Sequence, residues 1–168
     1  SRFSSESQIS IPDDSAFSIP FGGALTIEAW VNPEVRNTAG MGSTILRKFD
    51  NNSGQVEYAL SIMSDGTLRF FNGQGGSVGS GAPVPLNTWS HVAAVINNGN
   101  VTLFLNGNQI ATGAVNPFFG DSTAPVEIGN DQGNPFHFTG RIDEVALHRS
   151  SLTPSQIQQR MVSRTVSD

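Results

Sequence analysis

The sequence contains no cysteine, and this absence excludes disulfide scaffolds, thiolate zinc sites and cysteine nucleophiles. Charged residues make up only 14% of the chain, with eight arginines and a single lysine, so the exposed Lys and Glu faces of a helical bundle are missing. No window of about 18 apolar residues occurs, which predicts that no segment inserts into a membrane. The net charge is −5 and no basic cluster is present, so nucleic acid is not an expected partner.

Turn-forming residues are abundant instead, with 18 glycines and nine prolines. Between Leu25 and Leu147, short segments with a period near two alternate with Gly, Asn, Asp and Pro clusters, which predicts one all-β sandwich domain over residues 1–168. Three turn pairs, Asp65-Gly66, Asn98-Gly99 and Asn106-Gly107, are typical of type I′ hairpins because both residues tolerate positive φ.

Alternation within the segments predicts which side chains face the core. In residues 26–31, Ile27, Ala29 and Val31 suit a core, and Thr26, Glu28 and Trp30 share the opposite face. The same reasoning assigns two further sets to the core: Tyr58, Leu60 and Ile62, and then Leu68 and Phe70. Arg69 and Phe71 are left on an outer face.

One helix is predicted after the last strand. Thr153 suits the N-cap, Pro154 the first helical position and Gln156 the third, and Ile157, Met161 and Val162 form a narrow apolar stripe. By contrast, residues 72–85 carry five glycines and are predicted to form a long mobile loop.

Five motifs in order resemble the concanavalin A-like jelly-roll superfamily, and within it the laminin G-like domains. They are Leu-Thr-Ile-Glu-Ala-Trp-Val-Asn-Pro at 25–33, Trp-Ser-His-Val-Ala at 89–93, Leu-Phe-Leu-Asn-Gly at 103–107, Glu-Ile-Gly at 127–129 and Phe-Thr-Gly-Arg-Ile-Asp-Glu-Val at 138–145. The resemblance implies two stacked antiparallel sheets, one with a concave outer face. It also implies functions that range from lectins and carbohydrate-binding modules to adhesion domains and glycoside hydrolases, among which the fold does not choose.

The resemblance further implies a structural calcium ion. Asp143 matches an aspartate of the last strand that holds this ion in many relatives, and Asp13 and Asp14 lie in the amino-terminal segment that would complete the site. Asp143 could equally pair with Arg141 or cap a loop. A second candidate, residues 50–54, has an Asp-x-Asn-x-Gly spacing that also suits an ordinary turn.

Glycoside hydrolysis needs two carboxylates that face one cleft. The Glu-x-Asp-x-Glu type of run found in hydrolases of this superfamily is missing, and a cross-strand pair of Glu28 with Glu57 is the only route left. The three histidines are isolated in sequence, without ligand spacing or a nucleophile elbow. The sequence therefore predicts a protein that is not an enzyme.

Sugar recognition needs an aromatic face and polar groups that bind hydroxyls in pairs. The predicted outer faces carry both aromatic and polar side chains. Trp30 could instead belong to the core. The predicted ligand-binding residues are Glu28, Trp30, Arg47, Arg69, Phe71 and His91. A rim site formed by residues 116–121 and 130–137 is the alternative location.

Together these observations predict non-catalytic recognition of an oligo- or polysaccharide by an extracellular or cell-surface module. The chain begins at Ser1 without a Met, which suggests a processed or excised module, although a purified fragment would look the same. Other domains of a longer chain are expected partners. The alternatives are a protein-binding adhesion domain of laminin G type and a structural accessory domain of an exported enzyme.

Overall fold

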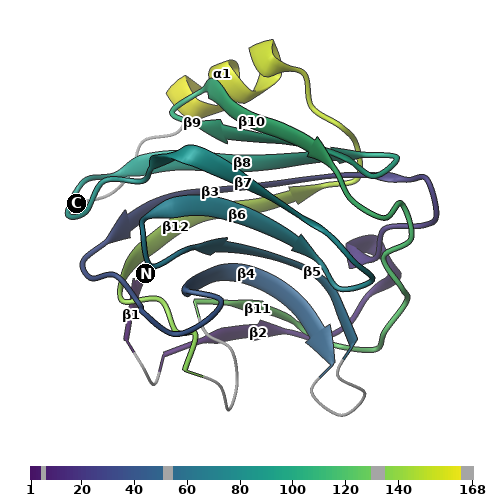
Figure 1. Cartoon of the computed structure of the whole chain (residues 1–168), viewed down its shortest axis with the longest axis horizontal. Helices are drawn as coiled ribbons and strands as arrows, with labels where there is room; N and C mark the ends of the chain where they lie inside the picture. Colours follow the sequence, from purple (N-terminus) through teal and green to yellow (C-terminus); the bar gives the residue numbers. More distant parts are fainter. Residues whose placement is uncertain (5–6, 51–54, 130–134, 164–168) are drawn as a thin grey trace.

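The computed structural model describes residues 1–4, 7–50, 55–129 and 135–163, which form a sandwich of two antiparallel sheets (Figure 1). We call the first the helix-covered sheet; its six strands, in spatial order, are β1 (Arg2–Phe3), β12 (Gly140–His148), β3 (Ala24–Pro33), β8 (Ser90–Asn97), β9 (Asn100–Leu105) and β10 (Asn108–Ala114). The second is the front sheet, with β2 (Ile9–Ile11), β11 (Val126–Ile128), β4 (Ser43–Asp50), β5 (Gln55–Ile62), β6 (Thr67–Asn72) and β7 (Ser77–Pro83). The jelly-roll prediction is confirmed.

The core lies between the two sheets, and the alternation in sequence places its side chains correctly. Ile27, Ala29 and Val31 of β3 are fully buried, as are Leu60 and Phe70 of the front sheet. Buried residues also lie opposite one another on neighbouring strands: Ile27 is paired with Ala94, and Leu60 with Phe70. The apolar inner face of each sheet is therefore continuous from strand to strand. Removal of this apolar surface from water is the main force that holds the two sheets together.

The predicted hairpins are present, but only two of their turns are of the predicted type. Asn98-Gly99 and Asn106-Gly107 have positive φ at both positions, as a type I′ turn requires. At the third turn only Gly66 has a positive φ. Asp65 instead accepts hydrogen bonds from the backbone N–H and the hydroxyl of Thr67, at 2.9 and 2.7 Å, and this Asx-type capping selects a longer turn.

The glycine-rich stretch after β6 is not a long mobile loop, because residues 77–83 form β7 at the edge of the front sheet. Val78 and Ser80 point inward and are buried, whereas Ser77, Gly79 and Gly81 are exposed. Arg69 lies opposite Gly79, and a Cβ atom at Gly79 would stand 3.1 Å from Nε of Arg69. Glycine at this position therefore leaves room for the arginine of the neighbouring strand.

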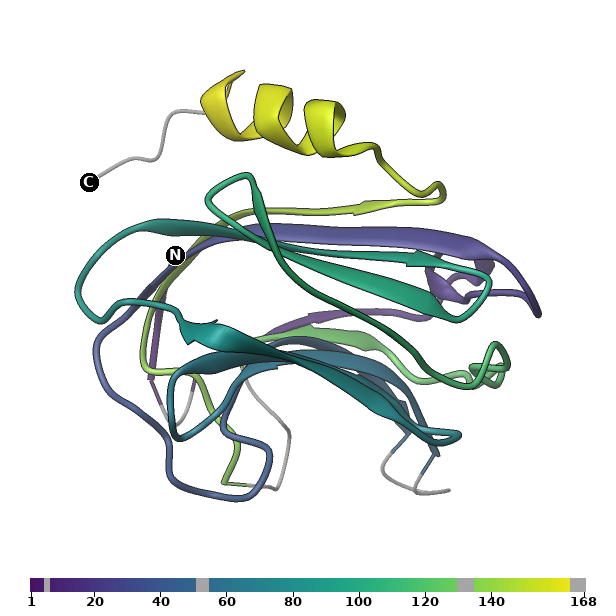
Figure 2. The same cartoon turned by 45° about the horizontal axis from the view of Figure 1, so that its top comes forward.

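Two short helical elements complete the fold, a 3₁₀ turn, η1 (Ser15–Phe17), and the C-terminal helix α1 (Pro154–Ser163). The predicted capping box is confirmed: the backbone N–H of Thr153 donates to Gln156 Oε1 and that of Gln156 donates to the Thr153 hydroxyl. Ile157 is buried against Ala93 and Phe104, so α1 covers the outer face of one sheet (Figure 2). Val162, predicted to share the apolar stripe, is 76% exposed.

Candidate functional site

The outer face of the front sheet brings together three of the six predicted ligand-binding residues, Arg47, Arg69 and Phe71. Arg47 of β4 lies opposite Ala59 of β5, which lies opposite Phe71 of β6. On the other side of β4, Glu127 of β11 is paired with Arg47. We call the set Arg47, Phe49, Arg69, Phe71 and Glu127 the front-sheet platform.

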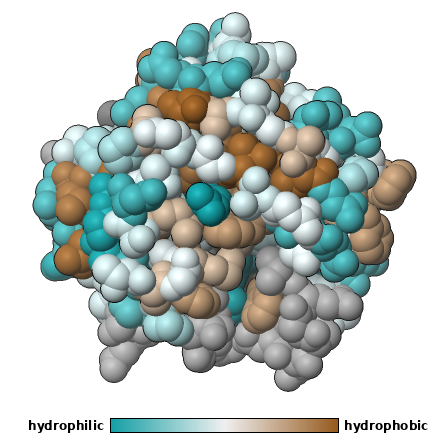
Figure 3. Space-filling view, viewed as in Figure 1, coloured by the Kyte–Doolittle hydropathy of each residue, from teal (hydrophilic) through white to brown (hydrophobic). Residues whose placement is uncertain are grey.

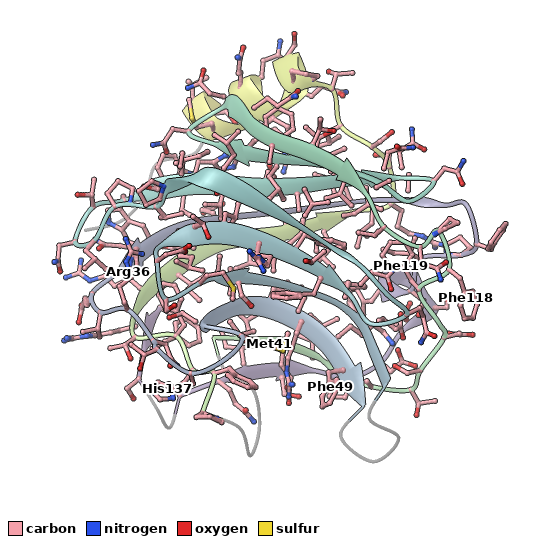
Figure 4. The ribbon with its side chains drawn as sticks, in the orientation of Figure 1. Arg36, Met41, Phe49, Phe118, Phe119 and His137 are labelled. Atoms are coloured by element: carbon pink, nitrogen blue, oxygen red, sulfur yellow. The ribbon has the colours of Figure 1, made fainter. Side chains whose placement is uncertain are left out.

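At one end of the platform, Arg47 and Glu127 form a buried ion pair. Nε and Nη2 of Arg47 lie 2.7 and 2.6 Å from Oε2 of Glu127, and the two side chains are 4% and 3% exposed. The guanidinium carbon also lies 4.6 Å from the ring centroid of Phe49, within the range of a cation–π contact. Figure 4 shows Phe49 near the end of β4 on this face. These contacts fix the plane of the guanidinium group beside an aromatic ring. Because Arg47 is buried, its predicted role as a residue that contacts a ligand is wrong, and it supports the platform instead.

The middle of the platform has a floor of small residues. Ala59 and Ser61 of β5 and Gly79 of β7 flank Arg69 and Phe71, which are both half-buried. Nε of Arg69 and the buried hydroxyl of Ser61 have no hydrogen-bond partner among the described residues. Both atoms are buried, so the groups that this part of the platform presents to solvent belong to the half-buried side chains of Arg69 and Phe71. Figure 3 shows hydrophilic and hydrophobic residues side by side on this face.

Glu28, Trp30 and His91 lie on the other sheet, so the six predicted residues do not form one site. They point away from the core, as their alternation predicts, and Trp30 packs edge-on against His91 with ring centroids 5.5 Å apart. Trp30 is half-buried, whereas Glu28 and His91 are each only 1% exposed. The interpretation of Glu28 and His91 as an open ligand surface is wrong, because α1 and the residues before it pack over this sheet.

Glu28 acts as an anchor for the C-terminal segment. Its Oε1 lies 2.5 Å from Nε of Arg160 in α1 and 3.1 Å from Nε2 of His148, and its Oε2 lies 3.6 Å from Nε2 of His91. Burial raises the pKa of the Glu28 carboxyl, but hydrogen bonds with His91, His148 and Arg160 outweigh this effect and lower the pKa to about 2. Glu28 is therefore ionised and engaged with protein groups.

The three predicted calcium ligands are not brought together. Asp13 lies 2.9 Å from Nζ of Lys48, and Asp14 caps η1 by accepting the backbone N–H of Ala16. Asp143 lies on β12 opposite Trp30 and accepts the backbone N–H of Glu144, which favours its alternative as a local cap.

No group of three or more His, Asp or Glu side chains suited to a metal occurs within the described ranges. The described residues thus do not assemble the expected donor set, and residues 51–54 of the second candidate, 50–54, lie outside them. Calcium binding through Asp143 stays a prediction. If Asp143 holds an ion, EDTA should lower the melting temperature, and Asp143→Ala should remove this response.

Glu28 and Glu57 also lie in different sheets, so they do not flank one cleft. The two segments of the predicted rim site are separated as well: Phe118 lies at the right edge of Figure 4 and His137 at its lower left. Residues 130–134 of the second segment lie outside the described chain.

The sequence interpretation missed Phe49, Glu127 and Lys48. Phe49 follows Arg47 at the spacing that places both on one strand face, which is a signal that could have been used. Glu127 lies in the Glu-Ile-Gly motif, but its pairing with Arg47 depends on β11 lying beside β4, which residues 80 positions apart do not reveal.

The chain belongs to the concanavalin A-like lectin/glucanases superfamily, because a laminin G-type family model of that superfamily matches residues 3–158. It is 25% identical over 148 residues to the adhesion G-protein coupled receptor V1 of Danio rerio, a match that spans 80% of this chain and 2% of the receptor. In the part of the chain that the structure covers, no helix has the length and apolar character needed to cross a membrane.

Solved structures share the fold at low sequence identity. A putative carbohydrate binding protein from Bacteroides ovatus superposes with a TM-score of 0.71 at 20% identity, over 94% of this chain and 45% of that one. Domain 4 of AbnA, a GH43 extracellular arabinanase from Geobacillus stearothermophilus in complex with arabinotriose, gives 0.66 at 23% identity, over 90% and 71% of the two chains. Trypanosoma rangeli sialidase gives 0.63 at 18% identity, over 84% and 23%. These similarities show the fold alone.

Proposed function

We propose that this domain is an extracellular, non-catalytic carbohydrate-binding module and that the front-sheet platform is its binding surface. One observation carries the proposal: half-buried Arg69 and Phe71 stand over a floor of small residues, beside a guanidinium that is fixed by Glu127 and Phe49. The carbohydrate-binding proteins among its structural neighbours support the same function.

The platform matches the chemistry of a sugar ring. The apolar face of a sugar stacks on an aromatic ring, and Phe71 and Phe49 provide such rings. The planar guanidinium of half-buried Arg69 has donors that engage adjacent hydroxyls. Affinity would arise from stacking, and specificity from the hydroxyls that reach these groups.

The carboxylates favour binding over hydrolysis. Glycosidases use one carboxylic acid as a proton donor and a second carboxylate as nucleophile or base. The platform contains one carboxylate, Glu127, and its Oε2 is held by two nitrogens of Arg47. Glu57 is bound by Lys48 and Ser122 instead. This distribution supports a module that recognises a sugar without cleaving it.

A glycan array followed by calorimetric titration tests the proposal. Binding competed by one free sugar should weaken by about tenfold or more in Arg69→Ala and in Phe71→Ala, since each loses a charged donor or a stacking ring. Arg141→Ala is the matched control, because Arg141 is exposed on the helix-covered sheet. Equal losses in all three variants, or full affinity in Arg69→Ala and Phe71→Ala, would contradict the assignment.

A protein-binding adhesion domain is the second candidate, favoured by the match to an adhesion receptor. If the correctly folded protein binds no acidic, neutral or fructose-containing glycan on the array, this function is favoured. The match spans only 2% of that receptor, so the presence of other domains beside this one is itself part of the proposal.

A further inference from the structure

A hollow lies at the rim of the sandwich, away from the front-sheet platform. It has a volume of about 280 Å³ and is walled by η1 and the turn after it, by the loop before β11 and by the residue that follows β12. Its lining residues are Ser15, Ser18, Ile19, Pro20, Phe21, Phe118, Gly120, Asp121 and Arg149. None of these residues belongs to the front-sheet platform, so the platform and this rim hollow can be tested separately.

Two phenylalanines beside the hollow face water. Phe21 is 76% exposed and Phe118 is 49% exposed, although large apolar side chains are mostly buried in a folded domain. Both lie within one lining, so they form a paired apolar surface rather than scattered single residues. Figure 4 shows Phe118 directed outward, whereas Phe119 lies further in.

The backbone that carries Phe118 is held in place. Phe119 is 1% exposed and packs edge-on against Phe70 in the core, with centroids 6.2 Å apart, which anchors the loop directly behind Phe118. The Phe118 N–H donates to Asn116 Oδ1 at 2.9 Å, and the Phe118 carbonyl accepts from Asn72 Nδ2 at 3.2 Å. The exposure of Phe118 is therefore imposed by the fold, not by a loose loop.

The turn that carries Phe21 is tied to the same loop. Gly22 N–H donates to the Pro117 carbonyl at 3.4 Å, and Gly23 N–H donates to the Pro20 carbonyl at 2.7 Å. Gly22 has a φ of +70°, a conformation that glycine adopts without strain. The two rings are consequently presented on connected backbone segments.

Two opposite charges complete the lining. Asp121 accepts a hydrogen bond from the Ser18 hydroxyl at 3.3 Å, which orients its carboxylate. Asp121 and Arg149 are exposed, and neither forms a salt bridge within the part of the chain that the structure describes. A guanidinium and a carboxylate that are both available can bind pairs of hydroxyls as donor and acceptor, and their charges cancel.

We propose that the rim hollow is a second ligand site, which binds one neutral sugar residue through Phe21, Phe118, Asp121 and Arg149. Aromatic walls with a few convergent polar groups are the usual composition of a small-ligand site, and this hollow is at the small end of the usual size range. The cancelling charges favour a neutral sugar over a uronic or sialic acid. A protein interface would need a much larger surface than this hollow provides.

Residue-resolved NMR tests this site independently of the platform. The probes are methyl glycosides of glucose, galactose, mannose and arabinose, with glucuronic acid as the anionic comparison. At least one neutral probe should shift the backbone amides of residues 18–22 and 118–121 in a saturable way. Phe118→Ala and Asp121→Asn should each weaken this binding by about tenfold, since each removes a stacking ring or a charged acceptor.

Val35→Ala is the matched control for Phe118→Ala, because Val35 is 53% exposed and lies outside the hollow. It should leave the titration unchanged. Shifts confined to residues 59–71 would support the platform and overturn the rim site, and shifts confined to the rim would do the opposite. The proposal is overturned if no neutral probe shifts the backbone amide signals of residues 18–22 and 118–121. It is also overturned if sedimentation shows a dimer that Phe21→Ala dissociates, because a second copy then covers these rings.

Discussion

The ammonium group of Lys48 lies 2.6 Å from Oε1 of Glu57, and their side chains are 0% and 1% exposed. Nζ also donates to the Ser122 carbonyl at 2.6 Å and lies 2.9 Å from Oδ1 of Asp13. The same Glu57 oxygen accepts the backbone N–H of Ser122 at 2.7 Å. One buried cation thus links β4, β5, the segment before η1 and the loop before β11.

Lys48→Met should therefore be strongly destabilising. It keeps the length and apolar volume of the side chain but leaves the Glu57 carboxylate buried without its cation, which costs about 3 to 5 kcal/mol of unfolding free energy. Urea denaturation measures this loss. Arg2→Met is the control, because it breaks an ion pair with Glu34 in which Arg2 is 73% exposed and should cost less than about 1 kcal/mol. Comparable losses in the two variants would show that the Lys48 network is not a structural anchor.

The low pKa of Glu28 predicts acid sensitivity with a definite sign. The carboxyl has a pKa of about 2 in the folded protein against an ordinary value of 4.5, so it stabilises the fold above pH 4.5, and this contribution is lost as the pH falls toward 2. The contribution amounts to about 3 kcal/mol at most. Glu28→Gln should remove it at neutral pH, and the difference from the parent protein should vanish near pH 2. A constant difference across this range would rule out the assignment.

Docking of α1 depends on Ile157, which is fully buried against the helix-covered sheet. Ile157→Ala should cost about 2 to 4 kcal/mol because it leaves a cavity beneath the helix. Val162→Ala, at a position that is 76% exposed, should change stability by less than about 0.5 kcal/mol. Hydrogen exchange of the helix amides should accelerate in the first variant only, and acceleration in neither would mean that other contacts hold α1.

Gly79 controls where Arg69 can lie. A methyl group there would approach Nε of Arg69 to 3.1 Å, so Gly79→Ala should displace the guanidinium and move its Nε–Hε NMR signal. Sugar binding at the platform should weaken severalfold with little loss of stability, since the arginine side chain is flexible. Gly81→Ala is the control, because no atom lies within 4 Å of its Cβ position. An unmoved Arg69 signal in Gly79→Ala would contradict the proposed packing.

The sequence predicted the properties that depend on neighbours along the chain. Alternation placed Ile27, Leu60 and Phe70 in the core, and the capping box placed the start of α1. It also predicted correctly that Glu28 points away from the core. What it did not predict is that a helix more than 100 positions away covers this residue, because Arg160 meets Glu28 only through tertiary docking.

The six predicted ligand-binding residues lie on two different sheets, and the sequence did not reveal this for the same reason. The alternation along one strand identified Arg69 and Phe71 as outer-face residues. It could not show that they share a sheet with Arg47 and not with Trp30, because this depends on the order of the strands in each sheet. The glycines of β7 were misread because composition alone indicates a loop, whereas their alternation with Val78 and Ser80 fits an edge strand whose small residues make room for Arg69.

The exposed positions of β7 have a consequence for how the recognition that we propose for the front-sheet platform can diversify. At Gly81 the backbone has an ordinary φ and open space around it, so any side chain that evolution introduces there would project from the edge of the front sheet without disturbing the core. Ser77 is exposed on the same strand. Related domains could therefore acquire different ligand preferences by single substitutions along one edge strand, while the sandwich and its buried ion pairs remain unchanged.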